Sequence, residues 1–181
     1  MIAAILEMIE ETAITPELDQ AIRHTLCASF PNDDGNFSLT RKWHGSGPEY
    51  TVLMQSERKV IAHVGVVDRQ IDIGGVPLHV AGVQNVCVLP DWRGKGLSDR
   101  VMIAAMQEAE TRGYDCGLLF CIPVLEKVYA RVGWISLGVR DVIRTENGQD
   151  LPIPDKNIAM YYPIKVKSLP EGIIHLRGND W

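Results

Sequence analysis

Apolar residues recur along the chain in two patterns, and together the patterns predict a domain of mixed helices and strands. Short apolar runs bounded by glycine, proline or polar residues are typical of strands, whereas apolar residues one helical turn apart indicate helices. We expect strands at residues 5–11, 50–55, 60–73, 78–89, 116–121, 134–143 and 157–166. Two of these strands are predicted to meet in a tight turn at Gly74 and Gly75.

The first expected helix is marked at its start by two residues. Thr15 carries a side chain that commonly caps helix N-termini, and Pro16 suits the first helical position. We expect this helix to run to about Ser29. The polar segment that follows, residues 31–48, predicts a long loop or an irregular hairpin.

Two later helices are predicted from their apolar stripes. The first is expected to run about four turns from Leu97 to Arg112, with Gly113 as its C-cap. Its apolar face carries Leu97, Val101, Ala104 and Ala105, and its polar face carries Asp99, Gln107 and Glu110. The second is expected from Pro123 to Gly133, with a stripe of Val124, Leu125, Val128 and Val132.

The turn before Leu97 carries the clearest chemical signal. Gly94 and Gly96 remove side-chain bulk in front of a helix N-terminus, where N–H groups lack intrahelical partners and the helix dipole is positive. Arg93 and Lys95 add positive charge, which suits a pyrophosphate better than a lone carboxylate. The glycine spacing fits neither a P-loop nor a dinucleotide fingerprint.

The segment from Arg93 to Ser98 resembles the coenzyme A pyrophosphate loop of the GNAT N-acetyltransferase superfamily, Arg-x-x-Gly-x-Gly/Ala, with Ser98 at the final small position. The segment from Lys127 to Trp134 is similar to the superfamily's second signature. The resemblance implies a GNAT fold of the α/β (α+β) class, in which helices flank a mixed central sheet with splayed central strands. We expect one acyltransferase domain over residues 1–181.

The resemblance also implies an acetyl-CoA site. Its expected residues are Val86, Cys87, Val88, Arg93, Gly94, Lys95, Gly96, Leu97 and Ser98. In the superfamily the strand before the loop is often bulged and presents free backbone N–H groups, here those of Val86 and Val88, to the thioester and pantetheine. Cys87 is expected to be a small core residue and not a nucleophile.

A thioester is already activated, so the chemistry needs an oriented amine, a route for its proton and a donor for the leaving thiolate. Deprotonating an amine with a pKa near 10 costs about 4 kcal/mol at neutral pH. Tyr129 matches the superfamily's signature tyrosine, which implies the role of acid toward the thiolate. The alternative for Tyr129 is a core aromatic residue.

A closer resemblance is to the aminoglycoside 2'-N-acetyltransferases, over about the last hundred residues. It rests on residues 83–88, 91–94, 129–134 and 176–181. That family has a glutamate as a water-mediated base where this chain has Gln84, which cannot take a proton but would position a water. The proton would then go to His79, His175, an acid such as Asp141, or bulk water.

The same resemblance implies that the C-terminal segment reaches the substrate pocket. Asp180 and the α-carboxylate of Trp181 would then bind ammonium groups, and the alternative is a frayed tail. Asp33 and Asp34 lie in a polar loop, where binding residues concentrate, and are further substrate-binding candidates. Residues 169–178 are similar to the nodulation N-acyltransferases, which transfer long acyl chains to an amino sugar.

Composition narrows the function further. A formal net charge of -5 argues against nucleic acid as a partner and is compatible with a cationic small molecule. The four cysteines lack C-x-x-C spacing, which favours reduced thiols, and we expect no metal. The N-terminus lacks a basic n-region and no apolar run reaches membrane-spanning length, so we expect a cytoplasmic protein without a membrane partner. A homodimer is a compatible assembly.

The sequence therefore predicts an N-acetyltransferase that moves an acetyl group from acetyl-CoA to a primary amine by direct attack. The expected acceptor is a small polar molecule of the aminoglycoside or amino-sugar kind. Two alternatives are a longer-chain N-acyltransferase of the nodulation type and a coenzyme A-binding domain without catalysis.

Overall fold

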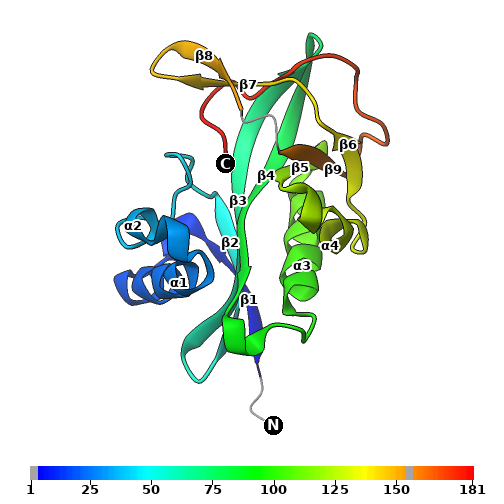
Figure 1. The fold of residues 1–181 in the computed structure, drawn as a ribbon. Helices are drawn as coiled ribbons and strands as arrows, with labels where there is room; N and C mark the ends of the chain where they lie inside the picture. Colours follow the sequence, from blue (N-terminus) through cyan, green and yellow to red (C-terminus); the bar gives the residue numbers. More distant parts are fainter. Residues whose placement is uncertain (1–3, 154–156) are drawn as a thin grey trace.

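The computed structural model describes residues 4–153 and 157–181. Figure 1 shows a curved sheet with α1 and α2 on one face and α3 on the other. The strands are β1 (Ile5–Glu10), β2 (Tyr50–Ser56), β3 (Lys59–Ile73), β4 (Val76–Val88), β5 (Cys116–Cys121), β6 (Ile135–Gly138), β7 (Val142–Glu146), β8 (Gln149–Pro152), β9 (Ile158–Pro163) and β10 (Ile174–His175). The α-helices are α1 (Pro16–Ser29), α2 (Asp34–Phe37), α3 (Leu97–Arg112) and α4 (Glu126–Ala130). Turns of 3-10 helix occur at Glu11–Ala13, Pro31–Asp33, Pro90–Trp92 and Pro123–Leu125.

The long hairpin of β3 and β4 organises the sheet. On one side β3 pairs with β2, which pairs with β1, and the far end of β3 pairs with β10, which leads to β7 and β8. On the other side β4 pairs with β5, followed by β9 and β6. The β4–β5 pairing is parallel and runs only from Val80–Cys116 to Gly82–Leu118, after which the two strands diverge. The expected mixed sheet with splayed central strands is therefore confirmed.

Each face of the sheet is buried against a different element. Val101 of α3 packs with Val64 on one face, and Ile22 of α1 packs with Leu53 on the other. The burial follows the alternation of the strands, because successive residues point to opposite faces. A third apolar cluster lies where Leu176, after β10, covers the distal part of the β3–β4 hairpin.

Several boundary signals act as predicted. The Thr15 hydroxyl accepts a hydrogen bond from the Leu18 N–H at 3.2 Å, with Pro16 at the first helical position. Gly74 and Gly75 form the hairpin turn, and Gly113 ends α3 with φ +78°. None of the helices in the described ranges combines the length and the hydropathy that crossing a membrane would require. The homodimer stays a prediction.

Other expectations were wrong in detail. The strand expected at 134–143 is two strands, because the chain turns at Gly138 with φ +66°, so that β6 pairs with β9 and β7 pairs with β8 and β10. The helix expected from Pro123 is a 3-10 turn followed by the short α4, and Val124 is 76% exposed and not part of an apolar stripe. The loop 31–48 contains a 3-10 turn, α2 and a bridge between Trp43 and Ser46.

Candidate functional site

A β-bulge in β4 lies where the sheet splays. Gly65 pairs with Gln84 and His63 pairs with Cys87, so Asn85 and Val86 together oppose a single residue of β3. Asn85 adopts φ +55°, and its carbonyl accepts a hydrogen bond from His63 Nδ1 at 3.0 Å. Burial lowers the pKa of His63 to about 4, so this ring is neutral and donates from Nδ1. The bulge that the family resemblance implies is therefore present, and the hydrogen bond from His63 holds its backbone in place.

The glycine-rich turn follows β4 after the 3-10 turn Pro90–Trp92 and leads into α3. Gly94 and Gly96 have φ +74° and φ +70°, and a Cβ atom at either position would meet nothing within 4 Å. Glycine is thus required here by backbone conformation, since L side chains disfavour positive φ. Arg93 Nε donates to the Val88 carbonyl at 3.2 Å, and the Lys95 ammonium group lies 4.5 Å from the Trp92 ring centroid.

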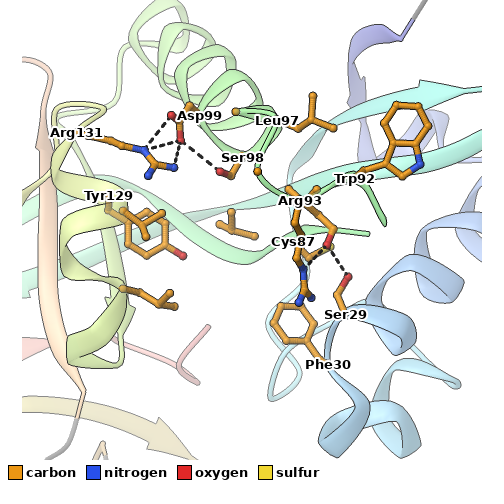
Figure 2. Close-up of a pocket in the computed structure, with 16 residues that line it drawn as sticks. Ser29, Phe30, Cys87, Trp92, Arg93, Leu97, Ser98, Asp99, Tyr129 and Arg131 are labelled. Atoms are coloured by element: carbon orange, nitrogen blue, oxygen red, sulfur yellow. Dashed lines mark hydrogen bonds and ion pairs between the residues drawn. The ribbon is translucent and has the colours of Figure 1, made fainter. Parts of the chain in front are cut away.

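A pocket of about 660 Å³ opens between this turn and α4 (Figure 2). All of the residues expected to bind acetyl-CoA line it except Lys95. Ser29 and Phe30, at the end of α1, and Leu125 and Val128 also line it, and none of these was expected at the cofactor site. The pocket combines the N-terminus of α3 at one end with apolar walls, which suits a ligand with an anionic head and an apolar arm.

An ion pair that sequence reasoning missed forms part of the wall of the pocket. Arg131, after α4, binds both oxygens of Asp99 in the first turn of α3, with Nη2 to Oδ1 at 2.7 Å and Nε to Oδ2 at 3.0 Å. The Ser98 hydroxyl donates to the same carboxylate at 3.3 Å. Figure 2 shows the pair above Tyr129. The only signal in the sequence was the arginine inside the second signature, because the partners are far apart along the chain.

Tyr129 stands between this pocket and a second one. Its hydroxyl points into the pocket in Figure 2, and its ring packs edge-on against Trp134 with centroids 6.5 Å apart. Burial raises the pKa of Tyr129, with smaller contributions from Cys121 and Cys87, so the phenol keeps its proton across the neutral range. The same side chain therefore packs against the core and presents a protonated hydroxyl to the pocket.

Cys87 is almost fully buried on the wall of the pocket. Burial raises the pKa of its thiol to about 12. A thiol in that state is protonated at neutral pH and is a poor nucleophile. All four cysteines are free, and only Cys27 is partly exposed.

The second pocket, about 390 Å³, adjoins the first. Phe30, Val86, Leu125 and Tyr129 line both pockets. The second pocket has aromatic walls, formed by Phe37, Trp43, Phe120 and Trp181, and it contains the carboxylates of Asp33 and Asp180. The shared wall joins the pocket at the start of α3 to an aromatic, partly acidic one.

Gln84 lies in the second pocket with both ends of its amide engaged. Its Oε1 accepts from the Trp43 N–H at 3.2 Å, and its Nε2 donates to the Ser46 carbonyl at 2.9 Å. The side chain is buried. Gln84 thus holds the loop between α2 and β2, and its expected catalytic role stays a prediction.

The C-terminal segment is docked, and the alternative of a frayed tail is wrong. Trp181 is 5% exposed, its Nε1 donates to the Leu118 carbonyl at 3.3 Å, and its ring lies so close to Gly82 that a Cβ there would come within 2.5 Å. Gly82 and Leu118 are the last pair before β4 and β5 diverge. Trp181 therefore packs at the point where the splay begins.

The expected substrate-binding acids are placed differently from one another. Asp180 is buried, with Oδ1 bonded to Arg144 Nη1 and Oδ2 to His44 Nδ1, each at 2.9 Å. Asp33 lines the second pocket, whereas Asp34 is exposed at the start of α2 and does not line it.

The alternative bases from the sequence are elsewhere. His79 pairs with Asp68 at 2.6 Å and His175 pairs with Asp150 at 3.1 Å. These two histidines and Asp141 line neither pocket.

Comparisons with known proteins agree with this geometry. The acetyltransferase (GNAT) domain family matches residues 12–136. Nodulation protein A from Bradyrhizobium elkanii is 40% identical over 98 residues, 53% of this chain and 45% of that protein. Aminoglycoside 2'-N-acetyltransferase from Mycolicibacterium fortuitum is 29% identical over 125 residues, 67% of this chain and 62% of that protein. The chain thus spans about half the length of the curated nodulation relatives that it matches.

A solved structure shows the same fold. The GNAT family N-acetyltransferase YhbS from Escherichia coli, in complex with CoA, superposes with a TM-score of 0.65 at 15% identity. The superposition covers 98% of this chain and 91% of that one.

Proposed function

Because this chain belongs to the GNAT acetyltransferase family, we propose that it transfers an acetyl group from acetyl-CoA to a primary amine of a small polar acceptor, within one acyltransferase domain over residues 1–181. The family match and the relatives confirm the expected resemblance and the expected class of enzyme. The observation that carries the proposal is the wall of Val86 and Tyr129, which joins the two pockets.

The residues of the first pocket fit acetyl-CoA. The amides at the start of α3, exposed behind Gly94 and Gly96, would bind the pyrophosphate together with Arg93. Val86 and Val128 offer apolar contact to the pantetheine arm, and the bulge at Asn85 turns the β4 backbone toward the thioester. Acetyl-CoA bound there supplies an acyl group that is already activated toward amines.

Tyr129 completes the transfer. The acceptor nitrogen forms a bond to the carbonyl carbon while the bond from carbon to sulfur breaks. Tyr129 donates its hydroxyl proton to the leaving sulfur and regains a proton from the new amide nitrogen through water. Because burial raises the pKa of Tyr129, the hydroxyl is in the protonated state that this role requires.

The second pocket supports an amino-sugar-like acceptor. Aromatic side chains such as Trp43 and Phe120 provide flat faces for the apolar side of a ring, and Asp33 provides a carboxylate for an ammonium group. The names of two relatives, an aminoglycoside 2'-N-acetyltransferase and nodulation protein A, support the same acceptor class.

One observation favours the longer-chain alternative as a second candidate. Ile122, Val124 and Leu125 are exposed apolar residues on one short segment, and Ile122 and Leu125 reach the pockets. A rim of this kind would shelter part of an acyl chain longer than acetyl. Comparing thiol release from acetyl-CoA, hexanoyl-CoA and palmitoyl-CoA separates the two candidates.

The test is a thermal-shift titration with acetyl-CoA, followed by a thiol-release assay with glucosamine, kanamycin and butylamine. We expect acetyl-CoA to raise the melting temperature in a concentration-dependent way, as linkage requires, and at least one amine to release thiol. Stabilisation without amine-dependent release would support the non-catalytic alternative. No stabilisation would overturn the proposed cofactor site.

A further inference from the structure

The proposed reaction needs an acceptor for the ammonium proton, and Gln84 cannot be that acceptor. Its amide has no basic atom, and both ends of it are bonded to the backbone of the loop that runs from α2 to β2. That loop carries His44. We propose that His44 is the general base for the acceptor amine and that Asp180 positions its ring, an inference that rests on the proposed function.

The contact between His44 and Asp180 defines which ring nitrogen is basic. Nδ1 lies 2.9 Å from Asp180 Oδ2, and a carboxylate only accepts, so Nδ1 carries the hydrogen. In the neutral ring Nε2 then holds the free lone pair. The other oxygen of Asp180 accepts from Arg144 at 2.9 Å, which fixes the carboxylate. A base oriented by an anchored carboxylate is a recurrent catalytic arrangement.

The ring of His44 lies beside the second pocket but is not among the residues that line either pocket. It stacks on Trp43 with centroids 4.6 Å apart, and both Trp43 and Asp180 line the second pocket. The side chain of His44 is 46% exposed, so an acceptor or a water can reach it. Figure 1 shows the C-terminus beside the loop that follows α2, which brings the two partners together.

The backbone of the loop is held in an unusual conformation at this residue. His44 has φ +43°, in the left-handed region that side chains rarely adopt. Gln84 binds Trp43 before it and Ser46 after it, and Asn179 Nδ2 donates to the His44 carbonyl at 2.8 Å. Backbone strain that neighbours over-determine is common at functional positions.

Among the described residues, charged groups near the ring of His44 come from the C-terminal segment, β7 and β3. Asp180 faces it directly, with Arg144 behind Asp180 and Glu146 behind Arg144 at 3.1 Å. Arg69 is on the other side of the loop, where it donates to the Ser46 hydroxyl and to the Asn179 carbonyl.

The proton balance is complete. The acceptor R–NH3+ gives one proton to His44 Nε2, directly or through one water, and the freed lone pair attacks the thioester carbon. A second proton reaches the sulfur by way of Tyr129, and the third remains on the amide nitrogen. His44 then returns its proton to solvent, so the products are the amide, the free thiol of CoA and one proton.

The test compares His44→Gln and His44→Ala with the unchanged chain over a range of pH. The acceptors are the best amine of the thiol-release panel and O-methylhydroxylamine, whose nitrogen is already unprotonated at neutral pH. With the amine we expect kcat/KM of both variants to fall about 100-fold near pH 7 and to recover as the pH approaches the pKa of the amine. With O-methylhydroxylamine the loss should be less than about fivefold.

Further readouts separate chemistry from folding. Added imidazole should restore part of the activity of His44→Ala, and Asp180→Asn should lower kcat/KM in the same pH-dependent way. His24→Gln, at an exposed histidine of α1, is the control and should match the unchanged chain. Melting temperature and acetyl-CoA affinity should stay unchanged in His44→Gln.

Two results would overturn the inference. One is a pH profile of His44→Gln that matches the unchanged chain. The other is an equal loss with both acceptors, which would mark His44 as a structural residue. Absence of amine-dependent thiol release from the unchanged chain would instead overturn the proposed function, and this inference with it.

Discussion

Two parts of the Tyr129 side chain meet separate demands, the ring in packing and the hydroxyl at the pocket. Its ring packs against Trp134 in the core that α4 covers, and its hydroxyl faces the pocket where the sulfur would leave. Burial raises the pKa of Tyr129 and so favours the donor form over the phenolate. The packing holds the hydroxyl in place, which is what a proton donor needs.

Tyr129→Phe separates the two demands, because it removes the hydroxyl and keeps the ring. We expect kcat to fall about 10-fold to 100-fold, with acetyl-CoA affinity within about twofold and stability changed by less than about 1 kcal/mol. Steady-state kinetics, calorimetric binding and urea unfolding measure the three quantities. A parallel loss of stability and activity would assign Tyr129 to the core alone.

At this scale the sequence predicted residues close to a motif and missed residues joined by the fold. The residues expected to bind the cofactor around Arg93 line one pocket, because neighbours in sequence share one turn. The pair of His44 and Asp180 had no local signal, because the two residues are 136 positions apart. Asp99 was assigned only to a polar helix face, since nothing local to it signals Arg131.

The element that matters most for the proposed cofactor binding is the start of α3. Gly96 precedes the first helical residue in a left-handed conformation, and no side chain caps the helix there. The N–H groups of the first turn therefore remain available to a ligand. A change in this backbone would therefore lower the affinity for the ligand more than it would disturb the packing of the core.

Gly96→Ala should destabilise the fold by about 1 kcal/mol and weaken acetyl-CoA binding at least about fivefold, because a Cβ disfavours φ +70° and shifts the turn. Gly148→Ala is the matched control, since Gly148 has φ +76°, has equally open surroundings and lies in the turn between β7 and β8. It should lose similar stability and keep its affinity. Equal affinities for both variants, measured by calorimetry, would argue against pyrophosphate binding at this turn.

Long elements with clear periodicity were predicted well, and short ones were not. The strands around Gly74 and the helix from Leu97 have enough apolar residues to define a period. β10 has two residues and exists only because β3 and β7 lie on either side of it. The split of 134–143 into two strands depends on which partner each half finds, and that is a property of the whole sheet.

At the scale of the whole molecule, Arg41 ties the loop with His44 to the first part of the chain. Its guanidinium binds Glu11 at 2.6 Å and Asp19 at 2.6 Å, and its carbonyl accepts from Asn85 at the bulge. Arg41 is buried. One residue thus connects the turn after β1, α1, the loop and β4.

This network predicts a dependence of stability on pH. Partial burial acts to raise the pKa of Asp19, but hydrogen bonds from Arg41 and Arg23 outweigh it and hold the pKa below 3.8. A lowered carboxyl pKa stabilises the fold above the unfolded value, and that stabilisation disappears as pH falls through the folded one. We therefore expect Asp19→Asn to be less stable than the unchanged chain by about 1 kcal/mol near pH 6, with the difference shrinking toward pH 2.

Urea unfolding at several pH values measures the difference, and Asp91→Asn, at an exposed position in the turn before α3, serves as a control that should show no such trend. A gap that stays constant down to the lowest pH would contradict the ionic origin of the effect.

The docked C-terminal segment has a consequence for folding during translation. Gly82 and Leu118 form part of a groove that Trp181 closes, and β10 pairs with a strand from the first half of the chain. During translation β3 to β5 leave the ribosome while residues 174–181 are still inside it. The groove is then apolar and open, and contacts of such long sequence separation form slowly. Until residues 174–181 emerge, this incomplete sheet exposes apolar surface, and we expect it to be the species that binds chaperones or aggregates.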